Sequence, residues 1–273
     1  MEKFIVTVGQ LVLTDPQDVF RQIEKIIVEN PETELFVFPE FSTQNNINLH
    51  AVGYLQEKAD AQKKVKKWLG LVPEFSQIQT LSDKQGKAIV IGSIAQENNH
   101  IFSRAYFYDP QSQQLEFYDK SHVHWTEEFL RPGTKIESMQ TRFGRIGLLI
   151  CYDMAFVEPT RVLGIQGAET LIAISAIPIH FHWKYPHYRM IGAAIFNQYY
   201  VIAANLGYTL EAPMSGYSGI YSPEGDLIAQ IRGTDCGNIS ARIDLNQVKL
   251  WREKEMIYPY RKPNLYGTLT KLR

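Results

Sequence analysis

The chain has 273 residues, with 28 lysines and arginines against 29 aspartates and glutamates, which gives a formal net charge of −1. This balance excludes the strongly positive surface that non-specific nucleic-acid binding requires. Only two cysteines occur, far apart in sequence, which excludes a disulfide framework or a Cys-x-x-Cys metal pair and favours a reducing compartment.

The N-terminal segment runs from Met1 directly into a strand-like stretch. It lacks the long apolar run and the small-residue cleavage site of a secretory signal. No stretch of about 18 apolar residues indicates a membrane helix. We therefore expect a soluble, cytoplasmic protein whose partner is a small molecule rather than a nucleic acid or a membrane.

Strand-like and helix-like patterns alternate through the first part of the chain. A strand rich in Val and Ile is predicted at Phe4–Val8, followed by an amphipathic helix at Asp15–Glu29 that Thr14 or Asp15 begins. The next predicted elements are strand Leu35–Phe38, helices Leu55–Trp68 and Glu74–Lys84, and strand Ala88–Ile94. This alternation is typical of an α/β fold.

The second part of the chain contains two predicted β-hairpins. They comprise Ser103–Tyr108 with Gln114–Tyr118, and Gly216–Ser222 with Leu227–Arg232. Between them we predict strands Ile146–Ile150, Thr170–Ser175 and Tyr200–Ala204, and helices Pro159–Gln166 and Tyr188–Gln198. Hairpins imply mixed sheets, and the number of strands favours two packed sheets with helices outside. We predict a single domain over residues 1–273, with an irregular tail at Tyr258–Arg273 as a candidate for a subunit interface.

Three side chains with complementary chemistry lie close to the C-terminal ends of predicted strands: Glu40, Lys120 and Cys151. A thiol attacks a carbonyl carbon as thiolate, so Cys151 needs a nearby base or a positive field. Glu40, buried among aromatic side chains, would have a raised pKa and could serve as that base. Lys120 and the backbone N–H of Tyr152 could stabilise an oxyanion. Singly, each residue is weak evidence: a lone cysteine is more often a buried structural residue, an isolated Pro-Glu favours a surface glutamate, and Lys120 is consistent with an exposed lysine.

Together, the three segments resemble the nitrilase superfamily of carbon-nitrogen hydrolases. Phe38-Pro-Glu40, Tyr118-Asp-Lys120-Ser-His122 and Ile150-Cys-Tyr-Asp153 occur in the order and at the spacing of that family. The likeness extends from the N-terminal strand to Arg261-Lys-Pro-Asn-Leu-Tyr266 and covers essentially the whole chain. The resemblance implies a Glu40-Lys120-Cys151 triad on a four-layer α-β-β-α sandwich of two mixed sheets. It also implies a homodimer, formed through helices around the nucleophile, and no cofactor.

The resemblance further implies a second glutamate, between the lysine and a Pro-Gly pair, that orients the lysine and the substrate. Glu127 and Glu128 both lie ahead of the pair Pro132-Gly133. We choose Glu128 because its offset from Lys120 is similar to that of the aliphatic amidase branch. The other member of the acidic pair is then a solvated side chain.

The chain departs from the family pattern in the helix after the nucleophile. Family members often read Arg-Ala-x-Glu-Asn there, whereas this chain has Ala193 and Phe196 in place of the arginine and the glutamate, and keeps Asn197. Arg189, one turn earlier, is a candidate to compensate. Tyr152, directly after the nucleophile, is similar to amidase and carbamoylase usage, where nitrilases usually have tryptophan, which favours an amide over a nitrile.

Four residues are predicted to line the substrate pocket: Tyr152, Trp125, His180 and Trp183. They flank the loops that leave the catalytic strands. The alternative is that these aromatic side chains pack at a subunit interface. An aromatic pocket favours a substrate with an apolar or flat portion.

Two His-x-His pairs support a competing hypothesis. His122 with His124, and His180 with His182, would each project to one face of a strand and could bind zinc, with Asp153 completing the ligand set. A metal-bound hydroxide would then attack the substrate. Such pairs also occur as plain polar side chains, so we assign no metal to the site.

We therefore predict a cysteine-dependent amidase that cleaves a non-peptide carbon-nitrogen bond of a small amide through a thioester intermediate. It releases an acid and ammonia or an amine, needs no cofactor, and assembles as a homodimer or a higher homo-oligomer. Three alternatives stay open: a nitrilase, a metal-dependent amidohydrolase that uses the His-x-His pairs, and a catalytically silent homologue that binds a ligand.

Overall fold

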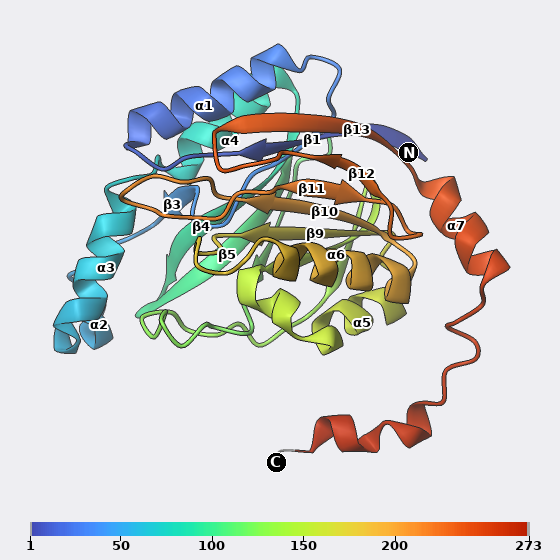
Figure 1. Ribbon diagram of the computed structural model, residues 1–273. Coiled ribbons are helices and arrows are strands. Elements are labelled where there is room, and N and C mark those ends of the chain that lie inside the picture. The colour runs from blue at the N-terminus through green and yellow to red at the C-terminus, as the bar shows by residue number, and fades with distance from the viewer. Residues whose placement is uncertain (1, 272–273) are drawn as a thin grey trace.

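The computed structural model describes residues 2–271 and contains two β-sheets packed face to face (Figure 1). The first sheet has seven strands, in the order β13-β1-β2-β4-β5-β6 with β3 paired to β4. Their bounds are β1 Lys3–Gln10, β2 Leu35–Val37, β3 Thr43–Asn45, β4 Ala88–Glu97, β5 His100–Asp109, β6 Gln114–Asp119 and β13 Gly237–Asp244. β1, β2 and β4 run parallel, and the outer pairs are antiparallel.

The second sheet has six strands in the order β12-β11-β10-β9-β8-β7. Their bounds are β7 Ser138–Thr141, β8 Gly144–Ile150, β9 Thr170–Ser175, β10 Tyr200–Asn205, β11 Gly219–Tyr221 and β12 Leu227–Gln230. The central strands β8, β9 and β10 run parallel, while β7 and the β11-β12 hairpin are antiparallel to their neighbours. Both sheets are mixed, as the two hairpins predicted.

Helices cover the outer face of each sheet, which confirms the predicted four-layer α-β-β-α sandwich (Figure 1). α1 (Pro16–Glu29) and α4 (Phe75–Gln85) pack on the first sheet, and α5 (Val157–Ile165) and α6 (Lys184–Asn197) on the second. The remaining helices are α2 Gly53–Glu57, α3 Ala59–Leu69 and α7 Leu245–Lys254, with short 3₁₀ helices η1 Cys151–Ala155, η2 Pro263–Leu265 and η3 Gly267–Thr270. None of the helices within residues 2–271 combines the length and apolar character needed to cross a membrane.

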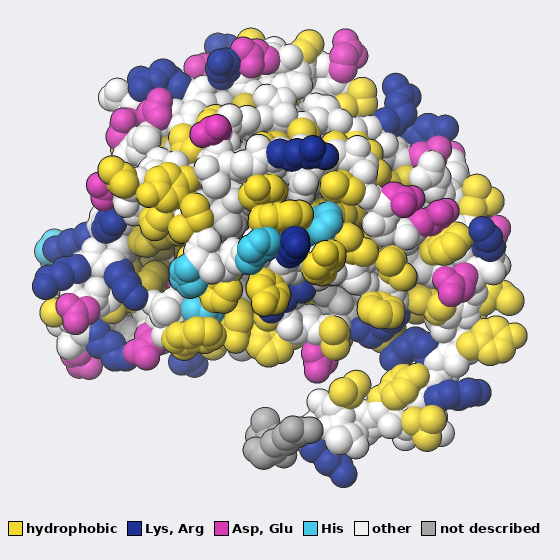
Figure 2. Space-filling view, in the orientation of Figure 1, with side chains coloured by type: hydrophobic (Ala, Val, Ile, Leu, Met, Phe, Trp, Pro, Cys, Tyr) yellow, Lys and Arg dark blue, Asp and Glu magenta, His cyan; other side chains and the backbone are white. Residues whose placement is uncertain are grey.

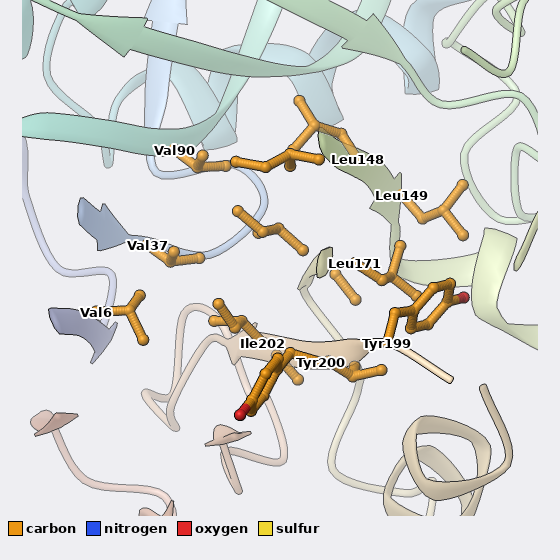
Figure 3. Packing of buried hydrophobic residues seen from close by; sticks show 14 of the residues in the cluster. Val6, Val37, Val90, Leu148, Leu149, Leu171, Tyr199, Tyr200 and Ile202 are labelled. Carbon is orange, nitrogen blue, oxygen red and sulfur yellow. The ribbon is translucent and has the colours of Figure 1, made fainter. Parts of the chain in front are cut away.

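The alternation of side chains along the strands separates two cores. Val37 and Val90 point between the sheets, toward Leu148 and Ile202 of the opposite sheet (Figure 3). Their neighbours in β2 and β4, such as Phe36, point outward and pack under α1 and α4. Because adjacent strand residues face opposite sides, both faces of the central strands are buried.

Several elements differ from the prediction. The helix predicted at Leu55–Trp68 is two helices, α2 and α3, separated by Lys58 in a non-helical conformation. Strand β13 and helix α7 were not predicted, because β13 is an edge strand in which Ile243 is the only residue classed as buried, so its apolar pattern is weak. β3 and β7 are short and were also missed.

The C-terminal tail leaves the body of the protein after α7 (Figure 1). The segment predicted to be irregular, Tyr258–Arg273, contains the two 3₁₀ turns η2 and η3. Residues 272–273 lie outside the described residues. Leu265 and Leu269 are largely exposed along this tail.

Gly92 in β4 allows the backbone of Pro39 and Glu40 to approach this strand closely. A Cβ atom at position 92 would lie 2.4 Å from Glu40 Cα and 2.6 Å from the Pro39 carbonyl oxygen. We predict that Gly92→Ala lowers the free energy of unfolding by about 1–3 kcal/mol through this overlap, and lowers hydrolytic activity as Glu40 shifts. Urea denaturation and steady-state kinetics measure both effects.

Gly53→Ala is the matched control, since a Cβ at position 53 meets nothing within 4 Å. It should stay within about 0.5 kcal/mol of the wild type. Equal stability of the two variants would contradict the close approach at Gly92.

Candidate active site

Glu40 is the third residue beyond the end of β2 and is completely buried. Its Oε1 accepts hydrogen bonds from Lys120 Nζ at 2.9 Å and from Ser103 Oγ at 2.8 Å. Its Oε2 accepts one from the backbone N–H of Ala176 at 3.0 Å. Ala176 directly follows β9 of the second sheet. The carboxylate therefore connects the two sheets at one end of the sandwich.

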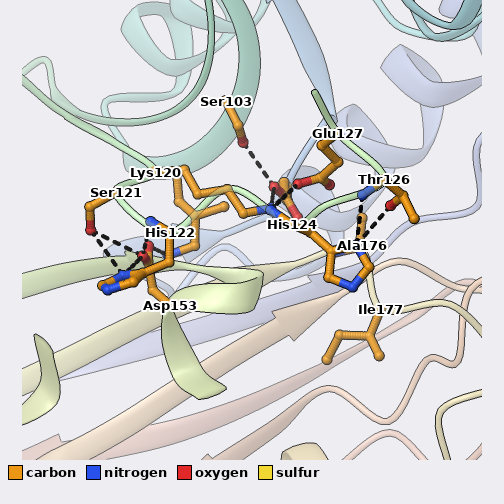
Figure 4. Close-up of polar contacts among 12 residues, drawn as sticks. Ser103, Lys120, Ser121, His122, His124, Thr126, Glu127, Asp153, Ala176 and Ile177 are labelled. Carbon is orange, nitrogen blue, oxygen red and sulfur yellow. Dashed lines mark hydrogen bonds and ion pairs between the residues drawn. The ribbon is translucent and has the colours of Figure 1, made fainter. Parts of the chain in front are cut away.

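Lys120 directly follows β6, and its side chain is also completely buried. Its ammonium contacts Glu40 at 2.9 Å and Glu127 Oε2 at 2.7 Å (Figure 4). The backbone N–H of Gly133 donates to the Lys120 carbonyl at 2.8 Å. A Cβ at position 133 would lie 2.2 Å from the Asp119 carbonyl oxygen, so only glycine permits this approach.

Cys151 begins η1 directly after β8, with φ at +48°. A non-glycine residue in this left-handed region marks a strained turn, which is common at functional sites. The turn points the thiol out of the strand direction, so that Cys151 lines the site cavity. The structure thus brings Glu40, Lys120 and Cys151 together from three strand ends.

The charges of these groups are strongly coupled. Burial raises the pKa of Glu40 above its ordinary value of 4.5, Lys120 opposes this rise and Glu127 adds to it. Burial also raises the pKa of the Cys151 thiol, the Glu40 charge raises it further and Lys120 opposes both. For Lys120, burial favours the neutral form, but Glu40 and Glu127 outweigh it and raise the pKa well above 10.5. The raised pKa of Cys151 therefore favours a protonated thiol near the Glu40 carboxyl group over a preformed thiolate.

Glu127 is the glutamate that contacts the lysine, so the choice of Glu128 was wrong. Glu127 is 17% exposed, and its Oε2 lies 2.7 Å from Lys120 Nζ. Glu128 is 73% exposed and its carboxylate lies 3.4 Å from Lys58 Nζ. The cause is a tight turn, in which the Glu127 N–H donates to the His124 carbonyl at 2.8 Å and directs the Glu127 side chain inward.

Asp153 holds the lysine-bearing and cysteine-bearing segments together (Figure 4). It is completely buried, and its Oδ2 accepts from Tyr118 Oη at 2.8 Å and from the Ile150 N–H at 3.0 Å. Its Oδ1 accepts a hydrogen bond from the backbone N–H of His122 at 2.8 Å and lies 2.8 Å from Nδ1 of the same residue. The same oxygen accepts from Ser121 Oγ at 3.1 Å. The Asp153 carboxylate thus connects Tyr118, Ser121 and His122, which flank Lys120 in sequence, to Ile150, which precedes Cys151.

A cavity of about 470 Å³ opens over Cys151, a volume typical of small-molecule sites. Its walls are formed by residues of the loop after β6, of η1, of the loop after β9 and of α6: His124, Trp125, Thr126, Glu127, Cys151, Tyr152, Met154, Ala155, Ala176, Ile177, Pro178, Phe181, Tyr185, Pro186, Arg189 and Met190. Figure 2 shows hydrophobic side chains dominating the face near α6, with histidines among them.

Of the four predicted pocket residues, Trp125 and Tyr152 line this cavity, and His180 and Trp183 do not. His180 lies against Phe181, with ring centroids 4.5 Å apart. Trp183 stacks on Tyr217 at 5.0 Å, at the start of α6. Placing these two residues in the pocket was wrong, because neither lines the cavity and each packs against a neighbouring aromatic ring instead.

Sequence reasoning missed the cavity residues that α6 supplies. The helix was predicted to begin at Tyr188, whereas it begins at Lys184 and includes Pro186 in its first turn. Proline is tolerated in a first turn, where its missing N–H costs no helical hydrogen bond. The spacing of Tyr185 and Arg189 on one helical face was the signal that could have found them. Ser103 was missed because it lies within a strand.

The His-x-His pairs give the metal hypothesis no ligand set. Neither pair lies in a strand, and His122 bonds to Asp153 while His124 packs edge-on against Tyr152 at 5.0 Å. Within residues 2–271, no three histidine, cysteine, aspartate or glutamate side chains converge on a point where a metal ion could bind.

Comparisons with known proteins agree with this geometry. The family model described as carbon-nitrogen hydrolase matches residues 5–253. The chain is 29% identical over 240 residues to N-carbamoylputrescine amidase from Solanum tuberosum, covering 79% of each chain. It is 30% identical over 246 residues to a hydrolase in the agr operon of Staphylococcus aureus, covering 87% of this chain and 88% of that one. A carbon-nitrogen hydrolase from Helicobacter pylori G27 has the same fold, with a TM-score of 0.80, 19% identity and 99% coverage of both chains.

The Asp153 carboxylate generates a prediction about stability and activity. Asp153→Asn replaces one acceptor oxygen by an NH₂ group that faces N–H and O–H donors. We expect the free energy of unfolding to fall by about 3 kcal/mol, because buried donors lose a charged acceptor. We also expect kcat to fall, because Lys120 and Cys151 lose their common anchor. Urea denaturation and steady-state kinetics measure these effects.

Asp60→Asn is the matched control, since the Asp60 side chain is 99% exposed and lies 3.9 Å from Lys63. It should leave stability and kcat near the wild-type values. Wild-type stability and kcat in Asp153→Asn would show that this carboxylate fixes nothing at the site.

Proposed function

The chain belongs to the carbon-nitrogen hydrolase family, and on this premise we propose that it is a cysteine-dependent amidase acting on a small amide. One observation carries the proposal: Lys120 contacts both Glu40 and Glu127, and Glu127 lines a cavity of small-molecule size together with Cys151. A nucleophile, a base and a cation are the groups that acyl transfer requires.

In the first step Cys151 Sγ attacks the amide carbon while its proton passes to Glu40. The raised pKa of Glu40 makes this carboxylate a better proton acceptor than an exposed glutamate. The C=O π pair moves to the oxygen, and the resulting oxyanion is stabilised by Lys120 and the Tyr152 N–H. An ammonium has three N–H donors, so contacts with two carboxylates leave one for the oxyanion.

In the second step the tetrahedral intermediate collapses, the C–N bond breaks, and Glu40 returns its proton to the leaving nitrogen. Ammonia or an amine departs, and a thioester remains on Cys151. Water then attacks the thioester carbon and gives a proton to Glu40. The C–S bond breaks, the sulfur recovers that proton, and the acid leaves. Protons balance over the cycle, and no cofactor enters any step.

Two observations favour an amide or ureido substrate over a nitrile. Tyr152 directly follows the nucleophile, at the position where nitrilases usually have tryptophan. The relative from Solanum tuberosum is named for a carbamoyl substrate, which supports the same class of bond here. A panel of simple amides, ureido acids and nitriles decides the question, and turnover of nitriles alone would overturn the proposal.

Cys151→Ala tests the nucleophile. We predict that it lowers kcat by a factor on the order of 10⁴ or more, since removing one member of a cooperating set costs most of the catalysis. Thermal denaturation should show an intact fold. Cys236→Ala is the matched control, because Cys236 is an exposed thiol away from the triad, and it should retain activity. Hydrolysis at the wild-type rate by a folded Cys151→Ala variant would refute the mechanism.

The dependence of kcat/KM on pH tests the base. Glu40 must be ionised to accept the thiol proton, so activity is lost as the pH falls through its pKa. Because that pKa is raised, the midpoint of the acidic limb should lie above 4.5. Glu127→Gln removes a charge that raises the pKa of Glu40, so the limb should move to lower pH, and kcat should fall.

Glu128→Gln is the matched control for this experiment, because the neighbouring carboxylate is solvent-exposed and lies outside the Lys120 contacts. Its acidic limb should coincide with that of the wild type. An acidic limb that stays in place or moves to higher pH in Glu127→Gln would contradict the assignment of Glu40 as the base.

A further inference from the structure

Charge is unevenly distributed around the catalytic cavity. Among the residues that line the cavity, Glu127 is the only acidic side chain and Arg189 is the only lysine or arginine. Burial lowers the pKa of His124, which keeps this lining histidine uncharged near neutral pH. Most other lining side chains are aliphatic or aromatic. A charged ligand group in the cavity therefore has few polar partners to replace its water.

The two charged residues differ in what they can offer a ligand. Glu127 is already committed, since its Oε2 accepts from Lys120 Nζ at 2.7 Å and from the His124 N–H at 3.3 Å. Arg189 is exposed, and no hydrogen bond or ion pair among the described residues engages its guanidinium. A guanidinium presents five N–H donors in a fork that matches a carboxylate.

The position of Arg189 in α6 follows from helical periodicity. Tyr185, Pro186, Arg189 and Met190 all line the cavity, and their spacing of i, i+1, i+4 and i+5 places them on one face of the helix. Arg189 thus belongs to the same wall as Met190, a buried residue of the core under α6. Cys151 lines the cavity as well, from η1. The nucleophile and the guanidinium therefore border one continuous space.

The position of Arg189 also bears on whether it takes over the contacts of the arginine that family members often have at position 193. It was a candidate to compensate for the arginine that family members often have where this chain has Ala193. Ala193 is 6% exposed and packs in the core, and Phe196 is 62% exposed, so neither keeps a polar contact there. Arg189 faces the cavity instead, which frees it for a ligand.

We propose that Arg189 binds a carboxylate of the substrate, so that the protein acts on small amides that carry a carboxylate group away from the scissile bond. The carboxamide lies at Cys151, an apolar portion follows the aromatic and aliphatic wall, and the carboxylate meets the guanidinium. This inference rests on the proposed amidase function and deepens it by naming the substrate class. The α6 wall of the cavity has no acidic side chain, so an ammonium group at the distal end of a substrate would meet Arg189 rather than a carboxylate.

The test compares monoamides of linear dicarboxylic acids with their methyl esters, which differ only in the charge at the distal end. We expect the wild type to prefer the acids in kcat/KM. Arg189→Gln should lower the preference for acid over ester by about tenfold, through a rise in KM for the acid. Arg189→Lys should restore part of the preference, because it keeps the charge without the fork.

Lys184→Gln is the matched control, since Lys184 is an exposed cation of the same helix that does not line the cavity. It should retain the wild-type preference. A preference that is unchanged in Arg189→Gln, or lost equally in Lys184→Gln, would overturn the inference and leave the amidase function standing.

Calorimetry separates the two proposals. The Cys151→Ala protein should bind a dicarboxylate monoamide, and the Cys151→Ala, Arg189→Gln protein should bind it about tenfold more weakly. Such a difference without turnover of any amide by the wild type would retain the carboxylate site and overturn the amidase function. Equal affinity of the two variants would overturn the carboxylate site.

Discussion

The site depends on one buried ammonium group held between two carboxylates. Lys120 has no exposed side-chain surface, and neither has Glu40. Removing such charges from water is costly, and close contact repays that cost only when the geometry is good. Two acids and one cation leave an excess negative charge, which burial opposes. The site therefore favours uptake of a proton, and the raised pKa of Glu40 expresses this. The burial that makes these charges costly also raises the pKa of Glu40, which suits the proposed role of this residue as a base.

Two further arrangements adapt this centre to a reaction. Asp153 ties the segments that carry Lys120 and Cys151 through backbone and side-chain hydrogen bonds, so the catalytic groups stand on a rigid support. The cavity above them is apolar apart from few groups, and Arg189 supplies its uncommitted positive charge. The groups around Lys120 thus supply the proposed hydrolytic chemistry, and the wall contributed by α6 supplies the proposed selection of the substrate.

Much of the fold was readable from the sequence, because strands with alternating or continuous apolar patterns report their own burial. β9 was predicted with its observed bounds, and α1 begins at the capping residue Asp15. β13 was not readable, since an edge strand buries too little to produce a pattern. The convergence of Glu40, Lys120 and Cys151 could be predicted because each of the three residues follows a strand. The choice between Glu127 and Glu128 could not, since it depends on one turn. Tyr185 and Pro186 were missed as cavity residues because the start of the helix was placed four residues too late.

The central claim is that Cys151 becomes covalently acylated during turnover. The most direct measurement is the intact mass of the protein, quenched in acid during hydrolysis of a reactive amide, followed by peptide mapping. The account predicts an added mass equal to the acyl group, located on the peptide that contains Cys151 and absent from the Cys151→Ala protein. Steady turnover with the added mass on another residue, or with the same added mass in Cys151→Ala, would contradict it.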